Sequence, residues 1–134
     1  MKMAETVSIL VARLIFGAVF LMAVSFKFMS MEGTATFIAA AGFPIPLVLA
    51  WLAAFLEVAL VVAFFSGAFF SYASYVAAAY VLFLCFAFHG PSHWSANQAE
   101  FGFFVDHFSF FAGLLFAAVH GPGDKLVWRI PRKV

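Results

Sequence analysis

The stretch PLVLAWLAAFLEVALVVAFFSGAFFSYASYVAAAYVLFLCFAF, residues 46–88, decides the fold. It carries one charged residue, Glu57, and one short turn, Ser66-Gly67. A bilayer core about 30 Å thick needs about 20 apolar residues per helix. The stretch therefore predicts two membrane-spanning helices, from Pro46 to about Phe65 and from about Phe70 to Phe88. Because the turn is so short, we expect these two helices to form an antiparallel hairpin.

Two further apolar runs bring the predicted spans to four. The first covers about Thr6 to Met29, and the last covers about Phe101 to Val119. We interpret the first run as a retained span rather than a cleaved signal, because Arg13 interrupts it and no clear small-residue cleavage site follows Lys27. The expected fold is all-α, a transmembrane four-helix bundle in which residues 1–134 form a single membrane domain.

The composition agrees with lipid as the solvent. Hydrophobic residues make up 66% of the chain, charged residues 10%, and the mean hydropathy is +1.10. A soluble domain usually has about a quarter charged residues. The net charge of +1 argues against nucleic acid as a partner. With a single cysteine, Cys85, the chain has no CxxC centre and no internal disulfide, so redox chemistry would need a cofactor, a metal or a partner.

The connections between the spans differ in character. Residues 32–41 are too short and too polar at their start to span, and they predict a short interfacial or re-entrant helix between spans one and two. Gly42-Phe43-Pro44-Ile45-Pro46 should end that helix and begin the second span. The last loop, residues 90–99, is the most polar internal segment. Its polar and aromatic side chains are His93, Trp94, Asn97 and Gln98.

Positive charge is concentrated at the two ends of the chain, at Lys2, Lys125, Arg129, Arg132 and Lys133. Cytoplasmic ends of membrane proteins carry an excess of lysine and arginine. We therefore expect both termini to be cytoplasmic, in a multi-pass protein of the bacterial inner membrane.

Ionisable side chains inside a span are costly and tend to face the bundle interior. The chain places there Arg13, Lys27, Glu57, Asp106 and His107, with His89 and Glu100 at span ends. Arg13 and Lys27 belong to one seam of the first span, which also holds Gly17, Phe20 and Val24 and advances by alternating steps of four and three residues.

Estimated depth in the membrane divides these groups in two. Counting about 1.5 Å per residue from the outer ends of the spans places Arg13 near Glu57, which predicts a buried pair. A purely structural role for this pair is an open alternative. Lys27, His89, Asp106 and His107 should form a second cluster near the outer end, although Lys27 could instead snorkel to the interface.

Motifs spread over most of the chain resemble the DoxX family of small four-helix membrane proteins. They are Arg13-Leu14, Gly17, Phe20-Leu21, Lys27, Gly42-Phe43-Pro44-Ile45-Pro46, Glu57, Gly67, His89, Phe101, Ala112-Gly113-Leu114-Leu115 and Gly121-Pro122-Gly123. The order and spacing of these pieces carry the resemblance.

The resemblance implies a membrane oxidoreductase role. Family members look like quinone-linked redox subunits, including the large subunit of thiosulfate:quinone oxidoreductase, or like accessory subunits of redox enzymes. By position, Arg13, Lys27, Glu57 and His89 carry over as functional polar residues. The chain departs from the family at Asp106-His107, where Lys-Asn is common. This departure reverses a charge and argues against carrying over an anionic substrate such as thiosulfate.

Quinone chemistry needs groups that bind the carbonyls and move protons, and histidines and carboxylates suit this work. We expect catalytic roles for His89, Asp106, His107 and Glu57, and quinone-binding roles for Arg13, Lys27 and Gln98. Haem ligation by His89 and His107, or a metal held by these histidines with His93 and an acid, is chemically reasonable. Lone membrane histidines more often do something else, so we expect neither haem nor a metal.

Three functions remain open. The protein could be a quinone-linked redox subunit that receives electrons from a membrane or membrane-associated redox partner. It could be a non-catalytic subunit that anchors or assembles a membrane redox complex. It could also bind quinone or lipid without turnover. A stripe of small residues in the last span, Ser109, Gly113 and Ala117, would permit a homodimer.

Overall fold

The computed structural model describes residues 2–129, and within them the chain is all-helical. The elements are α1 (Met3–Met29), α2 (Met31–Ala40), α3 (Pro46–Ser66), α4 (Phe70–His89), a short 3₁₀ helix η1 (Pro91–His93) and α5 (Ala99–His120). Helices α1, α3, α4 and α5 are long and apolar enough to cross a membrane. The predicted fold class and the four predicted spans are confirmed, and the chain is a multi-pass membrane protein.

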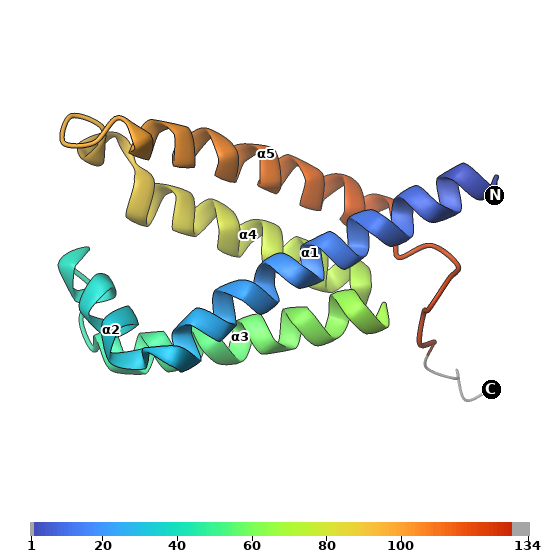
Figure 1. Cartoon of the computed structure of the whole chain (residues 1–134), viewed down its shortest axis with the longest axis horizontal. Coiled ribbons are helices and arrows are strands. Elements are labelled where there is room, and N and C mark those ends of the chain that lie inside the picture. Colours follow the sequence, from blue (N-terminus) through green and yellow to red (C-terminus); the bar gives the residue numbers. More distant parts are fainter. Residues whose placement is uncertain (1, 130–134) are drawn as a thin grey trace. The chain divides into compact units, whose positions relative to one another are not determined.

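The chain divides into two compact units (Figure 1). Unit 1 holds α1, α2, α3 and, at the C-terminal side, residues 122–129 of the described chain. Unit 2 is Ser71–Gly121, which contains most of α4, then η1 and α5. Each unit has its own polar centre, so each is described separately.

Unit 1 is organised around the contact between α1 and α3. The Phe20 ring stacks on Phe64 with 5.8 Å between centroids, and Phe16 also contacts Phe64. Gly17 lets the two helices approach closely, because a Cβ there would lie 2.8 Å from the Phe65 ring. The buried residues of α1 are Arg13, Gly17, Phe20 and Val24, so the predicted seam is confirmed up to Val24.

The connection between α1 and α3 folds as expected. The Ser30 side chain caps α2 by accepting a hydrogen bond from the Gly33 amide at 3.2 Å. Beyond α2, Gly42 adopts φ +88°, a left-handed backbone that glycine tolerates. Pro46 begins α3, where its missing N–H costs nothing. The predicted short helix and the break after it are confirmed; its position at or in the membrane stays a prediction, as does the orientation of the termini.

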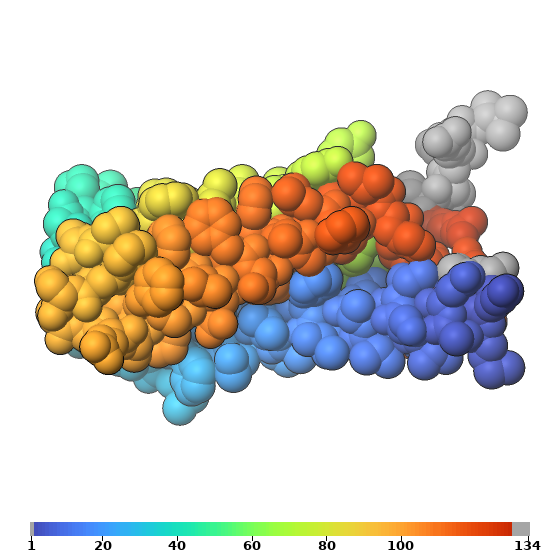
Figure 2. Space-filling view, turned by 90° about the horizontal axis from the view of Figure 1, so that it is seen from above, coloured from blue at the N-terminus to red at the C-terminus, as the bar shows by residue number. Residues whose placement is uncertain are grey.

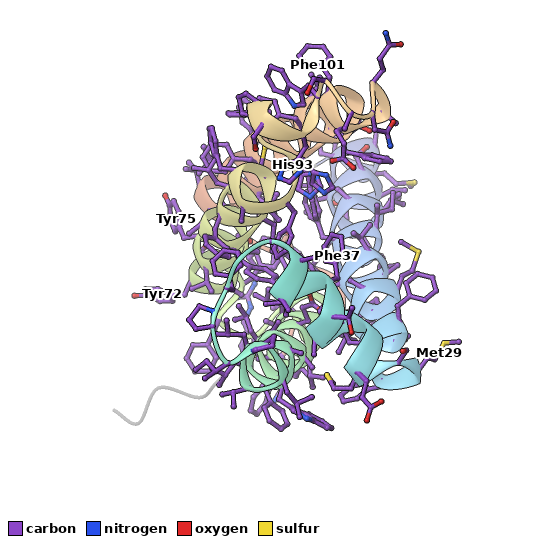
Figure 3. All side chains as sticks on the ribbon, turned by 90° about the vertical axis from the view of Figure 1, so that its left-hand side faces the viewer. Met29, Phe37, Tyr72, Tyr75, His93 and Phe101 are labelled. Carbon is purple, nitrogen blue, oxygen red and sulfur yellow. The ribbon has the colours of Figure 1, made fainter. Side chains whose placement is uncertain are left out.

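Unit 2 is held together by sulfur and ring contacts between α4 and α5. The thiol of Cys85 donates to the Phe104 carbonyl at 3.4 Å. The Phe86 ring meets Phe104 edge-on at 5.3 Å between centroids. Tyr72 and Tyr75 project outward from α4, as Figure 3 shows. The aromatic contacts lie toward the η1 end of the unit, where its ionisable groups also gather.

Candidate functional sites in two polar centres

The polar centre of unit 1 is an ion pair between α1 and α3. Lys27 Nζ lies 2.8 Å from Glu57 Oε1. The Glu57 side chain is 2% exposed and that of Lys27 is 18% exposed. Taking two charges out of water costs several kcal/mol per ion. The attraction between Lys27 and Glu57 in a medium of low dielectric offsets this cost. The pair therefore makes both charges compatible with their place on membrane-spanning helices.

This pair corrects the predicted Arg13–Glu57 pairing, which is wrong. Arg13 and Lys27 are 14 residues apart (27 − 13), which is about 21 Å along α1. The predicted pairing assumed that the outer ends of α1 and α3 lie at the same level. In the structure, Phe28 near the end of α1 meets Trp51, which lies five residues beyond Pro46 (51 − 46). Helix α3 therefore begins beyond the end of α1, and this offset brings Glu57 to the level of Lys27.

Arg13 serves a different purpose in unit 1. Its Nη1 donates to the carbonyls of Pro122 at 2.9 Å and Lys125 at 3.1 Å, and its Nη2 donates to the carbonyl of Leu126 at 2.7 Å. A Cβ on Gly67, which follows α3, would lie 3.3 Å from Nη1. The buried guanidinium thus lies at the carbonyl end of α3, where a cation is favoured. Backbone carbonyls, rather than a carboxylate, satisfy this charge.

The polar centre of unit 2 lies where α4 ends and α5 begins. His89 Nδ1 lies 2.5 Å from Glu100 Oε2, and both side chains are about one-fifth exposed, at 19% and 22%. The His107 ring lies 4.9 Å from the His89 ring, centroid to centroid. The predicted outer cluster is wrong in its assignment of Lys27, which pairs with Glu57 instead. The predicted proximity of His89 and His107 is confirmed. Their catalytic roles stay predictions.

The hydrogen bonds of the two imidazoles leave one nitrogen of each ring open. His107 Nδ1 lies 2.7 Å from the Phe103 carbonyl, which can only accept, so this nitrogen carries the proton. His89 Nδ1 likewise donates to the Glu100 carboxylate. Among residues 2–129, neither Nε2 atom has a hydrogen-bond partner. The centre therefore presents two imidazole nitrogens to a further group.

Aromatic side chains fix this centre in place. The Trp94 indole N–H donates to the His89 carbonyl at 2.9 Å, and its ring contacts Phe101 and Phe104. The Phe103 ring lies 5.4 Å from the His89 ring. These contacts anchor the loop after α4 to the first turns of α5. The apolar walls lower the local dielectric and strengthen the hydrogen bonds of the histidines.

The other predicted site residues lie apart from these contacts. Asp106 is exposed on α5 and, within residues 2–129, makes no hydrogen bond or ion pair. Gln98 is the exposed residue before α5, and its side chain does not cap that helix. Within the same described range, no group of three or more His, Cys, Asp or Glu residues could hold a metal ion.

Two features of these centres escaped the sequence-based reasoning. The first is Glu100 as the partner of His89, although its spacing of seven residues from His107 places both on one face of a helix. The second is the set of hydrogen bonds from Arg13 to the backbone carbonyls of the C-terminal segment. No local pattern predicts it, because its hydrogen-bond partners lie more than 100 residues along the chain.

A family model, DoxX, matches residues 8–90, more than half of the 134 residues. The match covers α1 to α4 and therefore includes Lys27, Glu57 and His89, whereas Glu100 and His107 lie beyond it. No curated protein and no solved structure matches. By the family match, the chain belongs to the DoxX family.

Proposed function

We propose that the protein is an integral membrane redox subunit of DoxX type that takes part in quinone-linked electron transfer with a partner. The observation that carries the proposal is the histidine centre of unit 2. His89 and His107 lie together, each has Nδ1 engaged by the protein, and each leaves Nε2 open. Such a centre can bind a carbonyl or hydroxyl oxygen and exchange protons with it.

The hydrogen bonds of His89 and His107 define their proton chemistry. With Nδ1 donating, a neutral ring has an accepting Nε2, which can take a proton from a hydroxyl. A protonated ring has a donating Nε2, which can give a proton to a carbonyl. The Glu100 carboxylate accepts the Nδ1 hydrogen bond of His89 at 2.5 Å, which leaves Nε2 of that ring to meet a ligand. Each ring can therefore take or give a proton at Nε2.

The surroundings of this centre fit a quinone. Phe103 lies against His89, and Trp94 packs on the same stretch of α5, so an aromatic ring finds apolar faces next to the open nitrogens. A bound quinone would supply the two-electron chemistry. The sequence carries no CxxC pair and no CxxCH haem motif, so the electrons would come from a partner. A bacterial inner membrane, where quinones dissolve in the bilayer, is the matching location.

The test measures the affinity of the protein, reconstituted in lipid nanodiscs, for the probe decylubiquinone. We expect His107→Gln and His89→Gln each to weaken binding about tenfold, the loss of roughly one charge-assisted hydrogen bond. The matched control is His120→Gln, an exposed histidine at the far end of α5 whose hydrogen bond in the described chain is to its neighbour Gly121. Absence of binding in the unaltered protein, or equal affinities for all three variants, would overturn the proposal.

The exposed carboxylate of Asp106 is an argument for a protein partner. An exposed carboxylate without an ionic partner in the described chain is costly on a membrane-spanning helix. A basic group on a neighbouring membrane protein would offset that cost. This observation also favours the second candidate function, a subunit that anchors or assembles a redox complex without turnover.

Copurification separates the two functions. A redox or assembly partner should be recovered in fixed ratio from mild detergent, and Asp106→Asn should reduce its recovery, with Glu5→Gln at the start of α1 as control. If the partner is present and quinone binds, the redox function holds. If the partner is present and quinone does not bind, the anchoring function replaces it.

A further inference from the structure

Three large apolar side chains are displayed outside the helices at one end of unit 1. Phe69 is 64% exposed, Leu126 is 72% exposed and Trp128 is 63% exposed. Phe69 lies just after α3, and the Trp128 amide donates to the carbonyl of Ser66, the last residue of α3, at 2.7 Å. All three therefore lie at the end of α3, beside the C-terminal segment that Figures 1 and 2 show next to the start of α1.

The backbone at two of these positions is strained. Phe69 and Leu126 both have φ +51°, a left-handed conformation that is rare for bulky residues. The Arg13 hydrogen bonds to the carbonyls of Lys125 and Leu126 hold the second of these turns. The side chains of Phe69 and Leu126 are both exposed, so burial does not compensate for the backbone strain. Strain that the packing does not explain points to a function for the displayed side chains.

Basic side chains flank the apolar ones. Lys125 is exposed, and Arg129 is paired loosely with Asp124 at 3.7 Å, with 76% and 61% of the two side chains exposed. An exposed pair of this kind contributes little stability, so Arg129 can exchange Asp124 for another anion. The segment thus places a cationic side chain on each side of the apolar run Leu126-Val127-Trp128, and Arg13 fixes the backbone where this run begins.

The position of these apolar and basic side chains at the end of α3 indicates which molecule they bind. Helix α3 is long and apolar enough to cross a membrane, so its last residue, Ser66, marks the level where the hydrocarbon meets the headgroups. Tryptophan is enriched at that level, and lysine and arginine next to it attract anionic lipids. We propose that Phe69, Leu126, Trp128, Lys125 and Arg129, the terminal patch, bind the headgroup region of anionic phospholipids.

The test uses the fluorescence of Trp128, obtained as the difference between the protein and its Trp128→Phe variant. The protein is reconstituted in vesicles of phosphatidylcholine that contain a small share of nitroxide-labelled lipid, either phosphatidylglycerol or phosphatidylcholine, labelled near the headgroup. We expect labelled phosphatidylglycerol to quench Trp128 several-fold more strongly than labelled phosphatidylcholine. Added salt should reduce the difference, because the attraction is electrostatic.

Variants assign this preference to the patch. The exposed pair Lys125→Gln/Arg129→Gln should abolish the preference and leave quenching by phosphatidylcholine in place. Lys2→Gln, an exposed lysine at the start of α1, should keep the preference and serves as the matched control. Three results would overturn the proposal. They are equal quenching by both lipids in the unaltered protein, a preference that survives the double substitution, and a Trp128 reached by aqueous iodide but by neither lipid.

Discussion

The two polar centres of the molecule differ in how their charged and titratable side chains are paired and hydrogen-bonded. In unit 1 Lys27 is paired with the buried Glu57, and the two terminal nitrogens of the Arg13 guanidinium donate to three backbone carbonyls. In unit 2 the His89–Glu100 pair is partly exposed, and it lies beside His107 with two ring nitrogens still open. Both centres place ionisable groups on membrane-spanning helices.

The difference teaches how to separate structure from chemistry in a membrane bundle. A charge that is engaged by protein groups inside the bundle contributes to folding, because losing a partner leaves an uncompensated charge in a low dielectric. A titratable group with an open nitrogen can still accept a ligand or a proton. On this criterion, variants of unit 1 should lose stability and variants of unit 2 should lose ligand affinity.

Breaking the Lys27–Glu57 pair should have the largest effect. Lys27→Met leaves Glu57 buried without its cation, and we expect the free energy of unfolding to fall by about 3–5 kcal/mol. Chemical unfolding in mixed micelles measures it. Lys27→Met/Glu57→Gln should recover most of the loss because it removes both charges.

The control for this pair is Ser25→Ala, an exposed position near Lys27 on α1 whose hydroxyl donates only within its own helix. It should change stability by less than about 0.5 kcal/mol. A double variant as unstable as Lys27→Met alone would show that charge pairing is not what Lys27 contributes.

Releasing the C-terminal segment should have the next largest effect. Arg13→Met removes three hydrogen bonds from a charged donor, and we expect a loss of about 2–3 kcal/mol. Trypsin should then cut after Lys125 faster than in the unaltered protein, because the segment is no longer held. Ser8→Ala, on an exposed face of α1, is the control. Equal cleavage rates in the two variants would rule out Arg13 as the anchor.

A substitution at Gly67 should have a smaller effect of the same kind. Gly67 has φ +73°, and an added Cβ would lie 3.2 Å from Val127 and 3.3 Å from Arg13 Nη1. Gly67→Ala should cost about 1–2 kcal/mol through backbone strain and crowding. Gly102→Ala is the matched control, because no atom lies within 4 Å of an added Cβ there. Equal stability of both variants would contradict this assignment.

Much of the fold follows from the sequence. The length of the apolar runs, the Gly42–Pro46 break and the seam through Gly17 and Phe20 are local patterns, and the structure confirms each of them. The proximity of His89 and His107 also followed, because both lie near the outer ends of their predicted spans.

The pairing of charges between helices did not follow from the sequence. It depends on the offset of α1 against α3, which is set by the contacts of Phe20 with Phe64 and of Phe28 with Trp51. Residue counting from the span ends cannot supply this offset. Arg13 was misassigned for a second reason, since backbone carbonyls of a distant segment carry no sequence signature.

Photolabelling with an azidoquinone tests the central claim most directly, because it asks which of the two polar centres the quinone contacts. The protein is labelled in its membrane, digested and mapped by mass spectrometry. We expect label on the residues around His89 and His107, in the end of α4 and the first turns of α5, and competition by unlabelled quinone. Label confined to the residues of α1 and α3 around Lys27 and Glu57 would contradict it.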